Sequence, residues 1–542
     1  MLTGMKGCSS IYLIAFLLIP QIYAAADKTL FDDKDDVIIY KENDYQHELY
    51  GGIRAHTFLL YSSWCGHCQR FAPAYKRLAE AIKTWSDVVP VAGVDCVFDV
   101  TVCRLFDVKG YPTLKFIGPT TNQSDVGVTY DGDRSQESMI EFIIKNLAAV
   151  KDPPRRWPNL HPVTVEEAKN YTSSAEVKKP KIVLFVDEER VGQRVMLDLQ
   201  KSDLRFAMVN SAASEELGAK AAGIGVLSEN GQVSHIAHVD TDPTKLEEAI
   251  NRILGDSSSA EVDSDGGKEG ENEKGIIEFI DTSLQYNNYE LDMQSSINTA
   301  LYMEVGLKTD FTEKELQDLK NFISVVRRCG SWTLDYKKQL ARVKNGLEDK
   351  ESLTNKEWAT ILEGATEAGF PRNSTFLGCK GSTPNTRGYT CGLWILFHTM
   401  LTSCYNAAPG SVSVLHAIHG FVDSFFTCSY CRDHFLSMAE QMKLLSIEED
   451  QTAVLALWEA HNQVNHRLST EIHDPYFPKI QYPPRSLCAK CSDDDGQFDS
   501  DQVFGFLMRH FRRVQTPFGR MRVTAKRKNK KPKKGKKGKK KG

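Results

Sequence analysis

Cys428-Ser-Tyr-Cys431-Arg-Asp-His434 follows an apolar helical run, 412–426, and the rest of the chain is interpreted outward from this stretch. Two cysteines separated by two residues at a helix start can close a small disulfide ring, and the helix N-terminus favours a thiolate at the first of them. His434 lies three residues beyond Cys431 and therefore shares its helix face. Alone, the stretch is compatible with a redox pair, half of a zinc site or a structural staple.

The chain of 542 residues is long enough for three or four domains. Residues 1–26 are typical of a secretory signal peptide, with Lys6 ahead of an apolar run at 11–19 and small residues at the expected cleavage site. No later run of 18 or more apolar residues follows, so we expect no transmembrane segment. We therefore expect passage through the ER and Golgi lumen and secretion. Three sequons fit this route: Asn122, Asn170 and Asn373.

The cysteines favour redox chemistry. Of the thirteen, Cys8 leaves with the signal peptide, and six of the remaining twelve form C-x-x-C pairs: Cys65/Cys68, Cys428/Cys431 and Cys488/Cys491. In an oxidising compartment such pairs are more often redox centres or short staples than metal ligands, so we expect no metal.

Residues 30–150 alternate strand and helix signals. The apolar strand 56–63 runs into Trp64-Cys-Gly-His-Cys68 and an amphipathic helix, 69–85, and further strands are predicted at 88–94 and 112–117. Cys96 and Cys103 lie close together on a predicted loop, and we interpret them as a local staple.

Residues 155–255 repeat this rhythm without the chemistry. Strands are predicted at 181–186 and 205–209, and Gly223-Ile-Gly-Val stands where a Gly-x-Pro turn would be expected. No cysteine lies between Cys103 and Cys329, so this region cannot be a dithiol centre, and a spacer or a substrate-binding surface is predicted. Residues 256–274 are acidic and rich in Gly and Ser, which predicts a flexible linker.

From about residue 283 to about 470 the apolar period becomes helical, and Leu316, Leu319, Ile323 and Val326 define one buried helix face. Two further helix faces carry aligned polar and aromatic groups. Trp394 and His398 lie at i and i+4, and a second face combines Trp458, His461, Asn462 and Asn465. Such side chains reduce stability unless they are paired, and a flat ligand with polar edges would pair them. Each face alone is more often core packing.

The N-terminal region resembles thioredoxin-like domains of the protein disulfide isomerase type. WCGHC closes a strand, Pro73 falls inside the following helix, and Gly110-Tyr-Pro-Thr precedes the third strand. The resemblance implies that Cys65 is the exposed nucleophile, Cys68 the resolving thiol and Pro112 a cis-proline beside them. A low thiol pKa at a helix N-terminus agrees with this role.

The motifs R-x-x-x-C-x-x-W-x-x-x-H from Arg387, C-x-x-C-x-x-H from Cys428 and W-x-x-H-N-x-V-N from Trp458 together resemble the FAD-binding four-helix module of Erv/ALR sulfhydryl oxidases. The resemblance implies a structural bridge between Cys379 and Cys391. It also implies that FAD is contacted by Arg387, Trp394, His398, Tyr430, His434, Trp458, His461, Asn462, Asn465, Lys479 and Tyr482.

The order of these regions resembles the quiescin sulfhydryl oxidase family. It implies a multidomain α/β plus all-α chain: a redox-active thioredoxin-like domain (30–150), a redox-inactive one (155–255), a helical pseudo-Erv segment (275–370) and an FAD-binding Erv module (371–515). The implied activity is oxidation of thiols in reduced secretory client proteins and small dithiols. Electrons would pass from Cys65/Cys68 to Cys428/Cys431, then FAD, then O2, giving H2O2.

Two other functions compete with this interpretation. A disulfide isomerase with a helical client-binding scaffold explains Cys65/Cys68 but gives no purpose to the aligned Trp, His and Asn side chains. A secreted zinc module would use both later C-x-x-C pairs, but the separation between them exceeds the usual ligand spacing.

The remaining cysteines leave alternatives open. Cys488/Cys491 is a third redox centre or, as we favour, a staple near the flavin. Cys329 and Cys404 are either buried thiols or bridged to each other.

The C-terminus is a separate problem. The formal net charge of the chain is −4, yet residues 526–542 carry twelve Lys and Arg and no acid. We predict a basic disordered tail at 516–542 with no apolar face. It is either a solvated segment without a specific partner or a site that binds polyanions such as sulfated glycans.

Overall fold

The computed structural model describes residues 29–40, 44–119, 122, 124–167, 182–186, 189–200, 205–209, 216, 223–227, 233–238, 282–367, 369–372, 374–383, 385–471, 474–516 and 519–522. The predicted signal peptide, the linker at 256–274, Asn170, Asn373 and the chain beyond 522 lie outside these residues. The chain divides into two compact units, Met1–Phe279 and Ile280–Gly542, which are described in turn.

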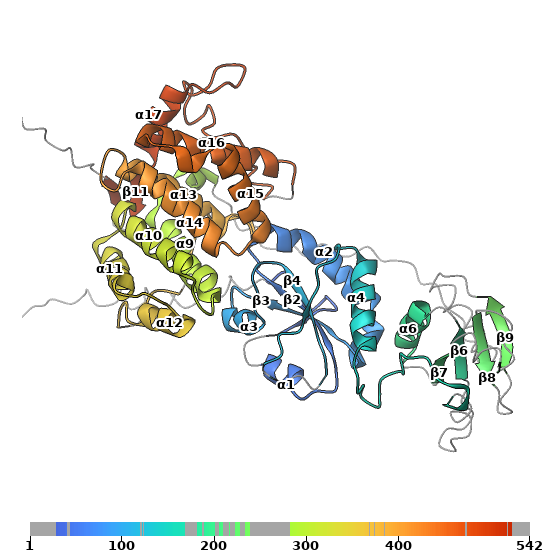
Figure 1. Ribbon diagram of the computed structural model, residues 1–542. Coiled ribbons are helices and arrows are strands. Elements are labelled where there is room, and N and C mark those ends of the chain that lie inside the picture. The colour runs from blue at the N-terminus through green and yellow to red at the C-terminus, as the bar shows by residue number, and fades with distance from the viewer. Residues whose placement is uncertain are drawn as a thin grey trace, which may run out of the picture. The chain divides into compact units, whose positions relative to one another are not determined.

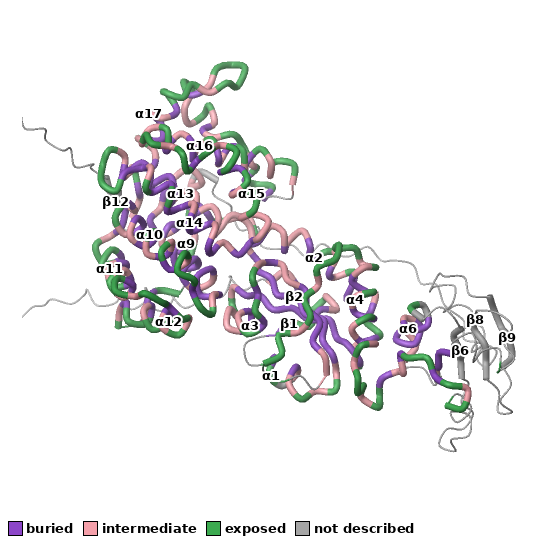
Figure 2. Tube along the Cα trace, in the orientation of Figure 1, coloured by how far each residue is buried: buried purple, intermediate pink, exposed green. Residues whose placement is uncertain are grey.

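The first unit contains a thioredoxin-like sheet of five strands in the order β1-β3-β2-β4-β5. Its strands β2, β3 and β4 are labelled in Figure 1. All six residues of the central strand β2 are buried (Figure 2). It pairs in parallel with β3 and antiparallel with β4, and α2 packs against α4. The elements are β1 Ile38–Ile39, α1 Tyr45–Leu49, β2 His56–Tyr61, α2 Gly66–Ala81, β3 Val91–Asp95, α3 Val100–Leu105, β4 Thr113–Ile117, β5 Val128–Thr129 and α4 Gln136–Ala148.

Two local predictions for this domain need correction. The helix predicted at 69–85 ends at Ala81, and a separate 3-10 turn, η1 Lys83–Asp87, follows because its fully buried Trp85 faces the core. Cys103 lies in helix α3 and not on a loop, and its disulfide joins this helix to Cys96, the residue after β3.

The second sheet of this unit has the order β7-β6-β8-β9, with β6 Ile182–Val186, β7 Arg205–Val209, β8 Gly223–Leu227 and β9 Val233–His238. Gly223-Ile-Gly-Val, which stands in place of a Gly-x-Pro turn, belongs to β8 and pairs antiparallel with both β6 and β9. Helix α6 Glu189–Asp198, which follows β6, packs against α4 and η1 of the first domain and against β6 and β7 of the second sheet. Trp85 Nε1 donates to Asp198 Oδ1 at 2.5 Å, and Arg194 forms an ion pair with Glu137 at 3.1 Å.

The second unit is a helical bundle. Its first half comprises α9 Glu290–Thr299, the π-helical turn η3 Ala300–Glu304, η4 Val305–Leu307, α10 Glu313–Cys329, α11 Leu334–Glu348 and α12 Asn355–Glu363. Its second half comprises α13 Gly388–Cys404, α14 Ser411–Phe425, α15 Ser429–Gln441, η5 Leu444–Ser446, α16 Asp450–Leu468 and α17 Ser500–His510.

The two halves share one core, although the sequence predicted a separate pseudo-Erv segment and Erv module. Helix α10 packs against α14 and α9 packs against α13. The predicted apolar face of α10 is buried, and its Phe322 stacks on Phe421 of α14 at 4.1 Å. A disulfide between Cys329 and Cys404 joins the ends of α10 and α13, which resolves the alternatives left for these cysteines.

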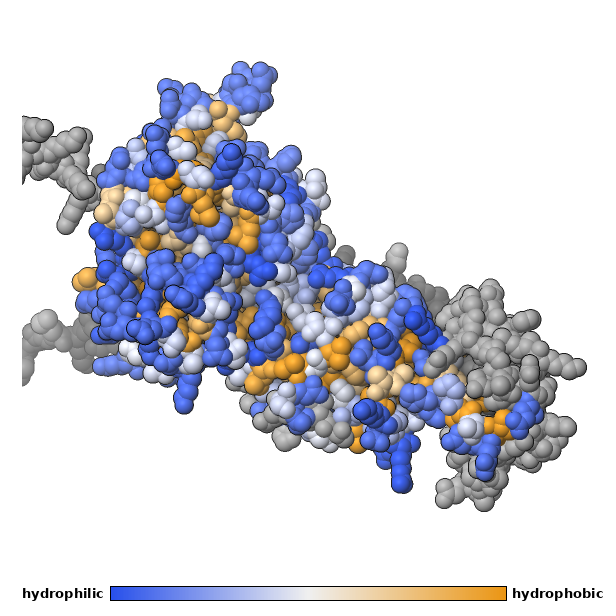
Figure 3. Space-filling model, viewed as in Figure 1, coloured by the Kyte–Doolittle hydropathy of each residue, from blue (hydrophilic) through white to orange (hydrophobic). Residues whose placement is uncertain are grey.

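A three-stranded sheet closes the bundle. Strand β11 Arg513–Thr516 pairs in parallel with β10 Asn288–Tyr289 and antiparallel with β12 Gly519–Arg522. The predicted disordered tail therefore starts too early, because residues 516 and 519–522 are paired in a sheet whose Val514 is fully buried. None of the helices in the described residues is both long and apolar enough to span a bilayer. The face in Figure 3 is largely hydrophilic, with apolar residues in small patches.

Candidate redox centres and cofactor site

The first C-x-x-C pair lies at the N-terminus of α2. Cys65 is the N-cap residue, with an extended backbone whose N–H donates to Ser62 O at 3.0 Å, and Cys68 lies in the first turn. Both side chains are in the thiol form and fully buried, so the expectation of an exposed Cys65 needs correction. The two thiols interact with each other through a side-chain hydrogen bond. The Tyr111–Pro112 peptide bond is cis.

A carboxyl group that the sequence analysis missed lies behind this pair. Asp95 ends strand β3, is buried, and accepts hydrogen bonds at Oδ1 from the backbone N–H groups of Ser63 (3.2 Å) and Val97 (3.1 Å). Burial raises the pKa of Asp95 to about 6. Burial also raises the pKa of Cys68 well above its ordinary value, with further contributions from Cys65 and the Asp95 charge. An acid at the end of a fully buried strand is the signal that would have identified it.

The second pair lies at an equivalent position on α15. Cys428 is its N-cap residue, is fully buried and forms a disulfide with Cys431 in the first turn. Of the predicted cofactor residues, Tyr430 and His434 come from the same helix, and their rings meet edge to face at 4.1 Å. Arg467 of α16 lies over the Tyr430 ring at 5.1 Å, a contact that the sequence analysis did not include.

Three predicted ring side chains come together between α13 and α16. Trp394 stacks on His461 with centroids 4.0 Å apart and planes 3° from parallel. His398 Nε2 lies 3.1 Å from His461 Nδ1, and the His398 ring stacks on Phe511 at 4.6 Å. Burial lowers the pKa of His398 to about 3 and that of His461 well below its ordinary value, so both rings are neutral at physiological pH. The cluster is a flat aromatic surface.

The predicted polar face of α16 has a different role from the one expected. Asn462 Nδ2 donates to Tyr482 O at 2.9 Å, and Tyr482 N donates back to Asn462 Oδ1 at 2.8 Å. Trp458 Nε1 also donates to Tyr482 O, and Asn465 Nδ2 donates to Ile480 O at 3.1 Å. The segment after α16 already satisfies these groups, so, contrary to the prediction, they need no ligand as a partner. They hold that segment in place.

Arg387 and Lys479 supply positive charge to the same region. The Arg387 guanidinium lies 4.2 Å from the Phe477 ring centroid and donates to Gly378 O at 2.8 Å, while its buried Nε has no hydrogen-bond partner among the described residues. Burial lowers the pKa of both cations. The Arg387 charge lowers the pKa of Lys479 further, whereas the Asp474 charge raises it. This pair of partly desolvated cations beside an aromatic surface fits a flat ligand with a diphosphate, as FAD is.

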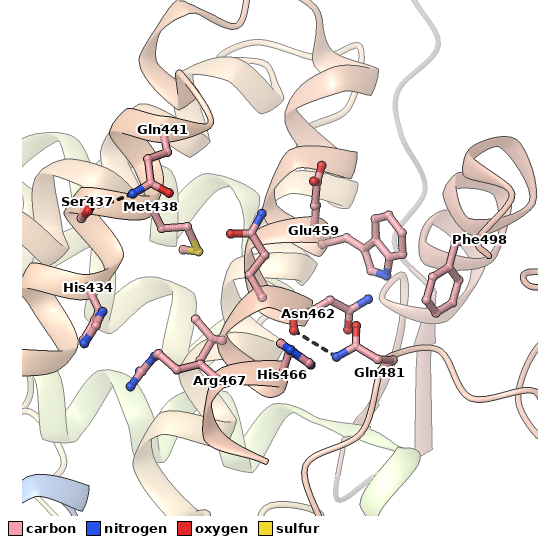
Figure 4. A pocket seen from close by; sticks show the side chains of 13 residues that line it. His434, Ser437, Met438, Gln441, Glu459, Asn462, His466, Arg467, Gln481 and Phe498 are labelled. Carbon is pink, nitrogen blue, oxygen red and sulfur yellow. Dashed lines mark hydrogen bonds between the residues drawn. The ribbon is translucent and has the colours of Figure 1, made fainter. Parts of the chain in front are cut away.

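A cavity of about 660 Å³ lies between α15 and α16 (Figure 4). Three predicted cofactor residues line it, namely His434, Trp458 and Asn462. Arg467 and Phe498 line it as well, and neither was predicted. Arg467 follows the W-x-x-H-N-x-V-N motif by two positions on the same helix, which is the signal that would have identified it.

The other predicted cysteine pairs are disulfide-bonded: Cys379 to Cys391, and Cys488 to Cys491. A zinc ion needs thiolates, but all four cysteines of the proposed zinc module are engaged in disulfides. Across the described ranges, no group of three or more His, Cys, Asp or Glu side chains is arranged to hold a metal ion. The predicted glycosylation site Asn122 is exposed.

Comparison with known proteins agrees with this division. The Thioredoxin family model matches residues 36–145, and the Erv1 / Alr family model matches residues 391–483. The chain is 27% identical to Sulfhydryl oxidase 1 of Gallus gallus over 526 residues, which is 91% of this chain and 69% of that protein. It is 28% identical to Sulfhydryl oxidase 1 of Homo sapiens over 524 residues (92% and 69%). Among solved structures it is similar to the sulfhydryl oxidase fragment of human QSOX1, with 32% identity, a TM-score of 0.40, and coverage of 42% of this chain and 96% of that one.

Proposed function

This chain belongs to the sulfhydryl oxidases that join a thioredoxin domain to an Erv1/Alr domain, and we propose its reaction on that basis. The chain is an FAD-dependent thiol oxidase that introduces disulfide bonds. The observation that carries the residue assignment is the Cys428–Cys431 disulfide at the N-cap of α15, in the same bundle as the Trp394–His461 surface and the Arg387/Lys479 cation pair.

The first exchange takes place at α2. A client thiolate attacks Cys65 Sγ of the oxidised Cys65–Cys68 pair, and Cys68 leaves as a thiolate. A second client thiolate then attacks the client sulfur of the mixed disulfide, so that Cys65 leaves and the client gains a disulfide. Two protons leave the client thiols and one electron pair stays on Cys65 and Cys68. The α2 N-terminus stabilises the thiolate of its N-cap residue, Cys65, during both displacements.

The second exchange transfers this electron pair to α15. The Cys65 thiolate attacks Cys428 Sγ and displaces Cys431, and Cys68 then attacks Cys65 Sγ and displaces Cys428. The Cys65–Cys68 disulfide is restored, and Cys428 and Cys431 hold the electron pair as thiols. Both leaving sulfurs lie at the first turn of α15, where the helix dipole stabilises a thiolate.

FAD bound at this site would supply the two-electron chemistry that links the Cys428/Cys431 dithiol to O2, with H2O2 as the product. We assign Arg387 and Lys479 to its diphosphate and Trp394, His398 and His461 to its flat rings. Tyr430 and His434 lie on the helix of the redox pair. Trp458, Asn462 and Asn465 act through the segment that includes Tyr482, which they hold by hydrogen bonds.

The test uses the purified full-length protein. We expect flavin absorbance, and with a reduced client protein we expect one molecule of H2O2 for each disulfide formed. A protein that lacks flavin and rearranges disulfides without consuming oxygen would instead be a disulfide isomerase. A Glu313→Gln variant, changed at an exposed position of α10, serves as the folding-matched control.

We further propose that the clients are secretory proteins encountered in the ER and Golgi lumen or after secretion. The signal-like N-terminus and the exposed Asn122 sequon support this compartment. The basic residues 526–542 support binding to polyanions. Salt elution from a heparin column, with and without these residues, tests that proposal, and equal elution of the two forms would contradict it.

A further inference from the structure

Glu304 brings a buried carboxyl group to the second redox centre from a distant part of the sequence. It ends the π-helical turn η3 and its side chain is fully buried. The backbone N–H of Thr427 donates to Glu304 Oε2 at 2.8 Å, and the Thr427 hydroxyl donates to the same oxygen at 2.6 Å. Thr427 directly precedes Cys428, the N-cap residue of α15. Glu304 belongs to the half of the bundle that has no C-x-x-C pair. Through Thr427 it contacts the residue that precedes the Cys428/Cys431 pair.

No positive charge compensates this carboxyl group in the described part of the unit. The Tyr389 hydroxyl of α13 faces it, and Thr427 supplies the two bonds above. The cation closest in sequence, Lys308, forms an ion pair with Glu315, and Arg432 of α15 pairs with Asp433. Arg387, which precedes α13, binds Gly378 O.

Burial raises the pKa of Glu304 to about 7, against the lowering effect of the Thr427 bonds and of Tyr389. A buried carboxyl group without a cationic partner reduces stability, so its presence beside a reactive centre needs a reason other than folding.

We propose that Glu304 is a positioning residue of the Cys428/Cys431 centre, whose carboxyl group holds Thr427 and whose charge controls the reactivity of Cys428. The proposal rests on the proposed thiol oxidase function. Opening of the Cys428–Cys431 bond removes the covalent link that orients the first turn of α15. The two bonds from Thr427 to Glu304 involve neither sulfur, so they hold the N-cap backbone in both redox states.

The sign of the charge effect follows from the two groups involved. A Glu304 carboxylate is a like charge for a Cys428 thiolate and raises the pKa of that thiol, in opposition to the α15 N-terminus. As the pH falls through about 7, Glu304 becomes neutral and this repulsion ends. Tyr389 stays protonated over this range because burial raises its pKa well above the ordinary value. Of Glu304 and Tyr389, Glu304 is therefore the one that changes charge over this range.

The experiment compares full-length holoenzymes in a Cys65→Ser background, so that a small dithiol such as dithiothreitol delivers electrons at Cys428. The variants are Glu304→Gln, Thr427→Val and the control Glu313→Gln. We expect kcat/KM for dithiothreitol to show an inflection near pH 7 in the parent and in Glu313→Gln, and no such inflection in Glu304→Gln. In a Cys431→Ser background, the pH dependence of alkylation should place the Cys428 pKa about one unit lower when Glu304 is Gln.

Thr427→Val keeps the carboxyl group but removes one hydrogen bond to it. We expect the inflection to move to higher pH, because that bond lowers the pKa of Glu304. If the Glu304→Gln and Thr427→Val profiles both superimpose on the parent, Glu304 is only a structural residue and the inference is overturned. An unmodified protein without flavin or oxygen consumption would instead overturn the proposed function. Flavin absorbance of each variant separates these two outcomes.

Discussion

The two redox pairs of this chain have the same position at a helix N-terminus, but the buried carboxyl group near each pair comes from a different part of the fold. Cys65 and Cys428 are both N-cap residues, and each is followed by its partner in the first helical turn. Each pair also has a buried carboxyl group close by, with a pKa raised to about 6 for Asp95 and about 7 for Glu304. Asp95 belongs to the sheet that carries its pair, whereas Glu304 comes from another helix, more than 120 residues earlier.

This difference indicates what the helical segment at 275–370, which has no C-x-x-C pair, contributes. The first pair is complete within one thioredoxin-like domain, including the short-range disulfide Cys96–Cys103. The second pair depends on a half of the bundle that has no C-x-x-C, through Glu304 and through the Cys329–Cys404 disulfide. The half of the bundle without a C-x-x-C pair thus contacts the half that carries one.

The largest expected effect separates the two pairs by function. Cys431→Ser should abolish flavin reduction by any thiol, because the second pair is the route to FAD in the proposed relay. Cys65→Ser should abolish oxidation of protein clients but leave oxidation of dithiothreitol largely intact, since a small dithiol can reach Cys428. Anaerobic stopped-flow absorbance of the flavin measures both variants. Full activity of Cys65→Ser on a protein client would show that the relay is wrong.

A second prediction concerns how the two pairs are braced. The double substitution of Cys329 and Cys404 by Ser opens a link over 75 residues, which in the chain-entropy model costs about 4 kcal/mol of unfolding free energy. The matched double substitution of Cys96 and Cys103 opens a link over 7 residues and should cost about 2 kcal/mol. A denaturant titration in which flavin release is the signal should detect the Cys329/Cys404 double substitution but not the Cys96/Cys103 one. Equal flavin release from the two double variants would mean that the halves of the bundle are not coupled through this bridge.

Local sequence signals predicted the helices and strands that carry both redox centres. The strand, C-G-H-C and helix of the first pair follow from periodicity and from a helix start, and all four predicted apolar residues of α10 are buried. The motif spacings placed Trp394 and His398 on one helix face and His461 on a face of a second helix, and in the structure these rings meet.

Contacts between distant segments could not be predicted in the same way. Nothing near Glu304 in the sequence indicates that it bonds to Thr427, and the Cys329–Cys404 pairing depends on how α10 and α13 end beside each other. Strand β12 was missed because its alternating Arg residues resemble the basic tail that follows. The Asn side chains of α16 were predicted as polar groups in need of partners, but backbone groups of the following segment satisfy them.

The third prediction tests whether the Glu304 carboxyl group is a cost to folding. Because the pKa of Glu304 rises from 4.5 to about 7 on folding, the folded state binds a proton that the unfolded state releases between these pH values. Stability of the natural protein relative to Glu304→Gln should therefore fall as the pH rises from 4.5 to 7, by on the order of 3 kcal/mol in total. Thermal unfolding of both proteins across this range measures it. A constant difference in unfolding free energy would mean that Glu304 does not titrate in this window.

The smallest expected effect tests whether Asp95 acts on the first pair as Glu304 does on the second. Asp95→Asn removes a charge that raises the pKa of Cys68, so this pKa should fall, and only slightly because burial and Cys65 contribute more. The ultraviolet absorbance of the thiolate, titrated in a Cys65→Ser background, reports it. Asn keeps the acceptor oxygen for Ser63 and Val97, so loss of fold is not the expected result.

The pH dependence of client oxidation compares the two carboxyl groups directly. Because Asp95 becomes neutral below pH about 6, the profile of Asp95→Asn should lose an inflection there, whereas the profile of Glu304→Gln should lose one near pH 7. If each variant altered the profile of the other pair as well, the two carboxyl groups would not be separate supports for separate centres.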